Sequence, residues 1–155
     1  KMMYDTREYC RTIFDEEVNM ILQYLVGNDI NDKNRITSKI VGIKQIVAYN
    51  TINIRYKHYK SYYIDKKLCG YNFLHIDNFD TYLRDCFIVC YYMDLCDRPM
   101  SLDISDTIQG TQFNKDKHQH LIKSTGNIIN YIIFPGLLDV YENNIKVLPI
   151  VYCGT

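Results

Sequence analysis

The sequence predicts an α+β fold, with N-terminal helices and one central apolar helix packed on a small, mostly antiparallel C-terminal sheet. Apolar residues recur at helical spacing along the N-terminal part of the chain. The most apolar helical run, around residues 86–103, stops abruptly at Pro99. Beyond that proline, short apolar stretches are separated by turn residues. Helices and strands therefore occupy separate parts of the sequence.

Length and composition are those of one globular domain spanning residues 1–155. The chain is 47% hydrophobic and 23% charged, enough to bury a core without disulfides. The formal net charge is zero, so no overall field favours nucleic acid as a partner. No apolar run is long enough to span a bilayer, and no signal peptide opens the chain, so we expect a cytoplasmic protein. Because the first residue is Lys1, we expect a fragment of a longer protein.

Two helices are predicted before the central one. Residues 1–11 are expected to form a short lead-in. Thr12 is then placed to cap a helix that ends at residues 27–28. Asn31 or Asp32 starts a second helix that fades after Asn50. Its expected apolar stripe consists of Ile36, Ile40, Ile43 and Val47, with Ile54 as a continuation.

The central helix is predicted from an apolar stripe at helical spacing, which consists of Phe79, Tyr82, Leu83, Cys86, Val89, Cys90 and Met93. Asp77 or Asn78 is placed to cap it, after a turn at residues 69–72. Pro99 should end this helix near Asp97.

Strands are expected from residue 100 onward. Alternation predicts one at residues 100–104, followed by a loop over 105–117 and an ambiguous segment over 118–123. Residues 128–138 are almost continuously apolar and predict a buried strand, which Pro135 kinks. A turn at 142–144 leads to a return strand over 145–152, where Pro149 indicates a sheet edge or a bulge.

The cysteines are expected to be structural thiols. No C-x2-C pair occurs, which disfavours a zinc ribbon, and Cys86 and Cys90 lie on the apolar helix. Unpaired thiols favour a reducing, intracellular compartment. Cys96 or Cys153 remains a possible nucleophile if a histidine lies nearby in space.

Motifs for catalysis or cofactor binding are absent from the sequence. It has no Gly-rich phosphate loop, no G-x-S-x-G and no H-E-x-x-H. His118 and His120 would point the same way on a strand and could bind a metal with Asp116, although solvated histidines are the more common outcome. We therefore expect no enzyme activity, no cofactor and no metal.

The one locally basic segment is residues 55–67, where tyrosines alternate with cations. Such a segment can contact phosphates while its rings stack on bases, or it can lie at an anionic membrane surface. It can also be a solvated helix end. As a lipid site it would use the basic residues Arg55, Lys57, Lys60, Lys66 and Lys67, with Tyr56, Tyr59, Tyr62 and Tyr63 as interfacial anchors.

The C-terminal part resembles the C-terminal domain of the mitochondria-eating protein (Mieap) family. CYYM at residues 90–93 and DRPMSL at 97–102 correspond to that family's Cys-Trp-x-Met and Pro-Pro-Met-x-Leu segments. KSTG at 123–126 and FPGL at 134–137 correspond to its Tyr-x-x-Ser-Gly and Trp-Pro-Ala-Leu. IFDEE at 13–17 is similar to its acidic helix start. The chain departs from the pattern in having no tryptophan and in having LPI where the family has Lys-Gly-Val.

The resemblance implies a non-enzymatic role in mitochondrial quality control, at the mitochondrial outer membrane, with cardiolipin as the anionic phospholipid bound.

The sequence as a whole leaves three hypotheses for the function. The first is a lipid-binding domain that uses residues 55–67. The second is a protein-interaction or self-association module that uses the tyrosine-rich face or the edge near Pro149. The third is a cysteine-dependent or metal-dependent enzyme. Nucleic acid is not an expected partner.

Overall fold

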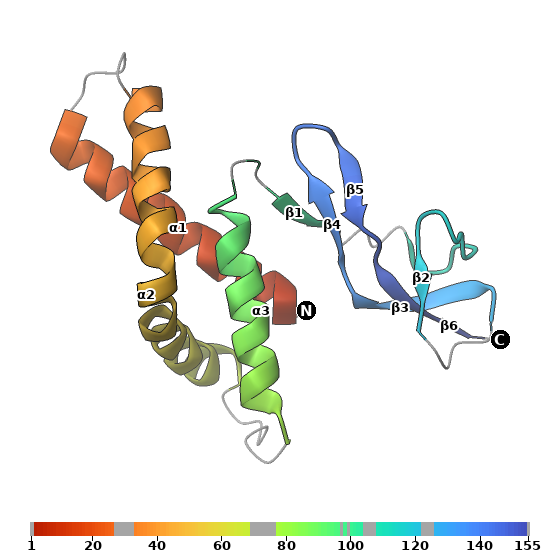
Figure 1. Ribbon diagram of the computed structural model, residues 1–155. Helices are drawn as coiled ribbons and strands as arrows, with labels where there is room; N and C mark the ends of the chain where they lie inside the picture. Colours follow the sequence, from red (N-terminus) through yellow and green to blue (C-terminus); the bar gives the residue numbers. More distant parts are fainter. Residues whose placement is uncertain are drawn as a thin grey trace. The chain divides into compact units, whose positions relative to one another are not determined.

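A computed structural model describes residues 2–26, 33–68, 77–96, 98, 100–103, 108–121 and 126–154 (Figure 1). The chain divides into two compact units, where the length predicted a single domain. Residues Lys1–Leu95 form a helical unit, and Cys96–Thr155 form a strand unit. The predicted α+β fold class is confirmed.

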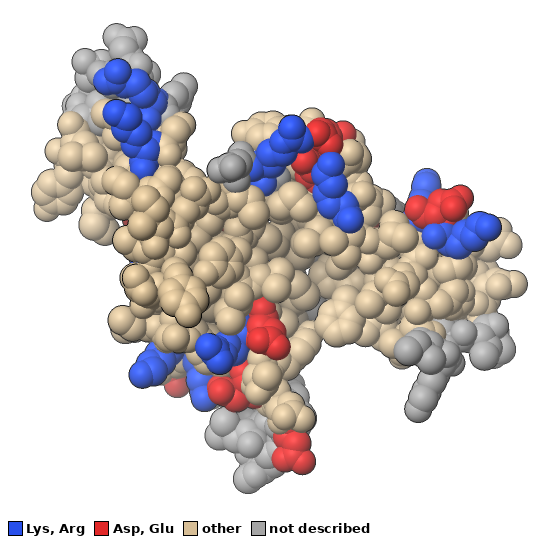
Figure 2. All heavy atoms as spheres, viewed as in Figure 1, with Lys and Arg blue, Asp and Glu red and all other residues tan. Residues whose placement is uncertain are grey.

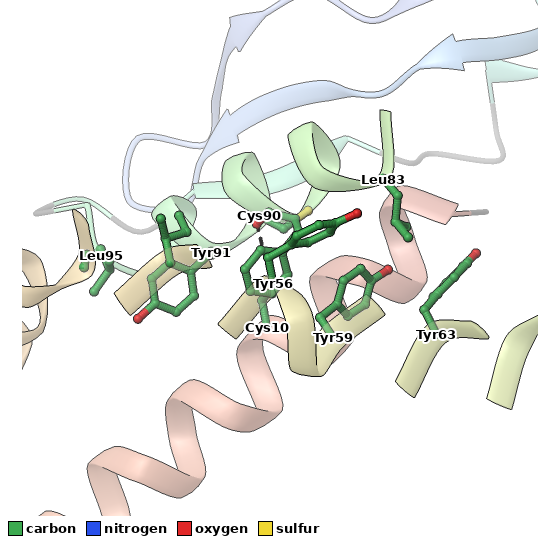
Figure 3. Packing of buried hydrophobic residues seen from close by; sticks show 11 residues of the cluster. Cys10, Tyr56, Tyr59, Tyr63, Leu83, Cys90, Tyr91 and Leu95 are labelled. Carbon is green, nitrogen blue, oxygen red and sulfur yellow. Dashed lines mark hydrogen bonds between the residues drawn. The ribbon is translucent and has the colours of Figure 1, made fainter. Parts of the chain in front are cut away.

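The helical unit contains α1 (Met2–Val26), α2 (Lys33–Lys67) and α3 (Phe79–Met93). These three helices pack against one another around one main core (Figure 3). The largest buried side chains in it are Tyr59, Phe87 and Leu83. The ring of Phe87 stacks between those of Tyr59 and Tyr91, with centroids 5.1 and 5.8 Å away. The predicted central helix α3 therefore does contribute to the core, together with an aromatic face of α2.

Helix α1 begins at Met2, so the predicted lead-in before Thr12 is wrong. Thr12 is not a cap. Its hydroxyl donates to the carbonyl of Glu8 within the helix, at 2.9 Å. The early turns are held by packing: Cys10 is buried in the main core, and Thr6 shares a 2.6 Å hydrogen bond with the hydroxyl of Tyr59.

Helix α2 continues to Lys67, well beyond the predicted end at Asn50. Ile52, Tyr56, Tyr59 and Tyr63 recur at helical spacing, and all four are buried. The predicted helix starts at Asn31 or Asp32 and the predicted turns at 27–28 and 69–72 lie outside the described residues.

Helix α3 begins after Asn78, as predicted, but the Asn78 side chain makes no capping hydrogen bond, and the residue takes a left-handed conformation with φ of 67°. The helix ends at Met93, four residues before the predicted end. There the chain turns, since the Leu95 N–H donates to the Tyr92 carbonyl three residues back. Leu95 then enters the core as a buried side chain.

The strand unit contains two three-stranded sheets. In one, β1 (Met100–Asp103), β4 (Gly136–Asp139) and β5 (Asn144–Val147) run antiparallel in the order β1-β4-β5. In the other, β6 (Ile150–Gly154) lies between β3 (Ile128–Phe134), its antiparallel neighbour, and β2 (Gln119–His120), which runs parallel to it. Ile129, Val151 and Cys153 form the buried centre of this second sheet.

Two prolines mark where the chain passes from one sheet to the other. Pro135 separates β3 from β4, so the predicted strand over 128–138 is two strands in different sheets. Pro149 separates β5 from β6 in the same way. The strand before Pro149, β5, is an edge strand with exposed side chains, as the proline indicated. Pro149 itself is buried and β6 is the middle strand of its sheet, so the exposed edge lies at β5 and not at Pro149.

Candidate functional site

The structure divides the predicted lipid-binding segment between the core and the surface. Tyr56, Tyr59 and Tyr63 are buried, and only Tyr62 is exposed among the four tyrosines. The buried hydroxyls have partners: Tyr59 bonds to Thr6, and Tyr56 donates to the Asp80 carboxylate at 2.8 Å. In the folded helical unit, these three rings are core residues and are not available as interfacial anchors.

The cations of the same segment differ in their surroundings. Arg55 is half-buried and pairs with Glu17 of α1, and Lys60 pairs with Asp80 at 2.6 Å. Lys57 and Lys66 are exposed. The side chain of Lys67 lies outside the described residues. Lys57 and Lys66 are thus the cations of this segment that the structure describes as solvent-facing.

A second surface of α2 was not predicted as a site. Ile43 is 61% exposed, Ile46 78% and Ile54 59%, and Val47 is also exposed. With Lys39 and Lys57, they lie along the side of α2 opposite the buried tyrosines, with the exposed Asn50 between Val47 and Ile54. We call the four apolar residues and the two lysines the outer stripe. Figure 2 shows this arrangement as an uncharged area over the middle of α2, with Lys and Arg side chains at both ends of the helix.

The outer stripe corrects the predicted packing of α2. One buried stripe was expected from Ile36, Ile40, Ile43 and Val47, continued by Ile54, which is exposed. Ile40 alone is fully buried, in a small cluster with Val18 and Leu22, whereas Ile43 and Val47 face solvent.

The charge of α2 is strongly one-sided. Residues 33–64 contain no Asp and no Glu, although they include seven Lys and Arg residues: Lys33, Arg35, Lys39, Lys44, Arg55, Lys57 and Lys60. Over residues 33–64, helix α2 therefore presents apolar and cationic groups without acidic side chains, although the whole chain is neutral; the exposed Asp65 follows, beside Lys66.

Two of these cations turn inward, toward α1. The Lys44 ammonium lies 2.7 Å from one oxygen of the Glu17 carboxylate, and Arg55 pairs with the other. Burial opposes the charged form of Glu17, but its two hydrogen bonds lower its pKa overall. Burial lowers the pKa of Lys44 despite the same carboxylate. The single carboxylate of Glu17 thus forms ion pairs with two cations in a partly buried cluster.

A cavity of about 310 Å³ lies beside this cluster in the helical unit. Its walls are the rings of Tyr9, Phe87 and Tyr91 together with Ile13, and Arg55 forms its polar side with Glu17. The Arg55 guanidinium lies over the Tyr91 ring, 5.4 Å from its centroid. Within the described structure, the buried Arg55 Nε has no hydrogen-bond partner.

An open groove adjoins the cavity along α1, sharing Tyr9 and Ile13 with it. Asp5, Glu8 and Glu16 line this groove. The approach along α1 is therefore acidic, in contrast to the cationic interior beside Arg55.

The thiols that the structure describes are buried, apart from that of Cys96. Cys10 and Cys90 are buried, and burial raises the pKa of both, that of Cys90 to about 12. Cys10 lines the cavity with His58, but its thiol is directed to the Phe87 carbonyl, 4.0 Å away. Cys153 is buried and Cys96 is exposed. A raised pKa disfavours the thiolate, which is the form needed for nucleophilic attack.

The histidine pair belongs to the strand unit. The Asn114 N–H donates to His118 Nδ1 at 3.1 Å, and the His120 ring lies against Phe113, with centroids 3.7 Å apart. Burial lowers the pKa of His118. Among the described residues, no three His, Cys, Asp or Glu side chains converge as metal ligands would.

Comparisons with protein-family models, with curated proteins and with solved structures found no match to this chain. None of the described helices combines the length and apolar character needed to cross a membrane.

Proposed function

We propose that this chain is a non-enzymatic binding domain that attaches to an anionic phospholipid surface through the outer stripe of α2. The observation that carries the proposal is the combination of exposed aliphatic side chains with Lys39 and Lys57 on one side of a helix that has no acidic residue between positions 33 and 64.

Each part of the stripe suits a membrane surface. Aliphatic side chains such as Ile46 enter the boundary between headgroups and acyl chains, while flanking lysines remain at the headgroups. Each basic residue near an anionic surface contributes about 1 kcal/mol to binding. Lys66 and Tyr62, exposed near the C-terminal end of α2, add a cation and an aromatic ring to the same helix.

The resemblance to the Mieap family supports cardiolipin as the lipid and the mitochondrial outer membrane as the location. Cardiolipin carries phosphates close together, and lysines at both ends of an apolar stripe can contact more than one headgroup. The proposal keeps the predicted ligand and moves the main contact from residues 55–67 to the outer stripe.

Flotation of the purified chain with vesicles tests this function. We expect binding to vesicles that contain cardiolipin, weaker binding to phosphatidylcholine alone, and loss of binding as salt is raised. Absence of binding to cardiolipin vesicles at low salt would contradict the proposal.

Protein interaction is the second candidate, because exposed apolar residues of this kind also mark protein interfaces. Met20, Tyr24 and Leu25 on α1 add to the apolar surface of the helical unit. Sedimentation at increasing concentration distinguishes the two. A chain that self-associates and does not bind vesicles would favour the protein interface.

A further inference from the structure

The cavity beside Arg55 has the features of a small-molecule site. Its volume of about 310 Å³ is at the lower end of the range for ligand pockets, about 300–1,000 Å³. Aromatic rings form most of its wall, and its few polar groups are concentrated on one side, as in ligand sites generally.

The charge on that side is incompletely balanced. Lys44 and Arg55 share the single carboxylate of Glu17. The neighbouring Arg7 and Asp94 neutralise each other in a separate ion pair. This leaves one positive charge in excess in a partly buried cluster, which favours a monoanion.

Arg55 is the cation that a ligand in the cavity would meet. Its Nη1 binds Glu17 and its Nε is closed off from solvent. Arg55 nevertheless lines the cavity, so a ligand can contact the accessible part of its guanidinium group. A carboxylate oxygen is well suited, since guanidinium groups bind carboxylates strongly.

The acidic groove further limits the kind of ligand that can reach the cavity. Asp5, Glu8 and Glu16 line the open surface next to the cavity, and they would repel a ligand with several negative charges. A single carboxylate attached to an aromatic or short acyl group fits both the charge and the walls.

We propose that this cavity binds a small monocarboxylate, with its carboxylate accepting a hydrogen bond from the Arg55 guanidinium group and its apolar group lying against Tyr9, Phe87 and Tyr91. The site is separate from the outer stripe and does not depend on membrane binding.

Phenylacetate and its uncharged analogue phenylacetamide provide a matched test, with dissociation constants measured by NMR titration of the full chain. We expect phenylacetate to bind at least about tenfold more tightly than phenylacetamide, because a hydrogen bond to a charged group contributes that much binding free energy. The NMR chemical-shift changes should be largest for the residues that line the cavity. Equal binding of the two compounds, or no binding of either, would overturn the proposal.

Three variants locate the site. R55Q should reduce phenylacetate binding to the level of phenylacetamide, and I13W should block both compounds by filling the cavity. I46Q, on the outer stripe, should leave both unchanged. If R55Q does not fold, I13W alone tests the location of the site. Unchanged phenylacetate binding by I13W would contradict the proposal that the cavity is the binding site.

Discussion

Arg7 and Asp94, 87 positions apart in the sequence, form a two-pronged ion pair that joins the start of α1 to the residue after α3. Arg7 Nη2 lies 2.7 Å from one carboxylate oxygen, and Nη1 contacts the other. Both side chains are about nine-tenths buried, at 10% and 11% exposure. The pair fixes the end of α3 against α1.

Breaking this pair should strongly destabilise the helical unit. D94A leaves Arg7 buried without its partner, which we expect to cost about 3–5 kcal/mol of unfolding free energy. R11A is the control, since it removes a surface pair with Asp15 on the same helix and should cost less than about 1 kcal/mol. Urea unfolding followed by circular dichroism measures both. Similar costs for the two variants would contradict a structural role for the buried pair.

Glu17 should make stability depend on pH. Its folded pKa is lowered below the ordinary value of 4.5, so its contribution is present above pH 4.5 and is lost as pH falls through the folded pKa. We expect the difference in unfolding free energy between the wild type and E17Q to be largest near neutral pH and to shrink below pH 4.5. A difference that stays constant down to pH 3 would show that Glu17 ionisation does not stabilise the fold.

Two glycines should respond to alanine in opposite ways. A Cβ at Gly42 in α2 meets no atom within 4 Å, so G42A should stabilise the helix by about 1 kcal/mol. A Cβ at Gly136 would lie 2.7 Å from the Val147 carbonyl oxygen and 2.9 Å from Pro149 Cδ, so G136A should destabilise the strand unit. Thermal unfolding of each variant shows whether its stability rises or falls relative to the wild type. Stabilisation by G136A would contradict the close approach of β4 to the segment after β5.

Periodicity was sufficient to predict α3 and β1. The buried residues Leu83, Cys86 and Cys90 hold the positions that helical spacing assigned to them, whereas Tyr82 and Val89 of the same predicted stripe are exposed. The pattern also identified Pro135 as an interruption. It could not show that β3 and β4 join different sheets, because strand partners are set by contacts distant in sequence.

The C-terminal half of α2 was missed although a signal was present. Tyr56, Tyr59 and Tyr63 continue the helical spacing from Ile52, but their polar hydroxyls and basic neighbours indicated a surface. The partners that allow burial, Thr6 and Asp80, lie in other helices. A sequence pattern does not reveal such pairings.

The orientation of α2 was missed for a related reason. Charged residues are normally assigned to the outside of a helix, and isoleucines to the inside. Here Glu17 of α1 holds Lys44 and Arg55 inward, and Ile43, Ile46 and Ile54 are turned outward. The position of Glu17 in the fold accounts for the inward Lys44 and Arg55, and a sequence pattern does not show it.

Flotation of two matched double variants with cardiolipin vesicles tests the central claim most directly. I43Q/I46Q removes apolar side chains from the outer stripe, and V140Q/Y141Q removes exposed apolar side chains from the turn after β4 in the strand unit. Burying one such side chain contributes about 1.5–3 kcal/mol, so the stripe variant should bind at least about tenfold more weakly. The control should float like the wild type. Equal flotation of I43Q/I46Q and wild type would contradict membrane attachment through α2.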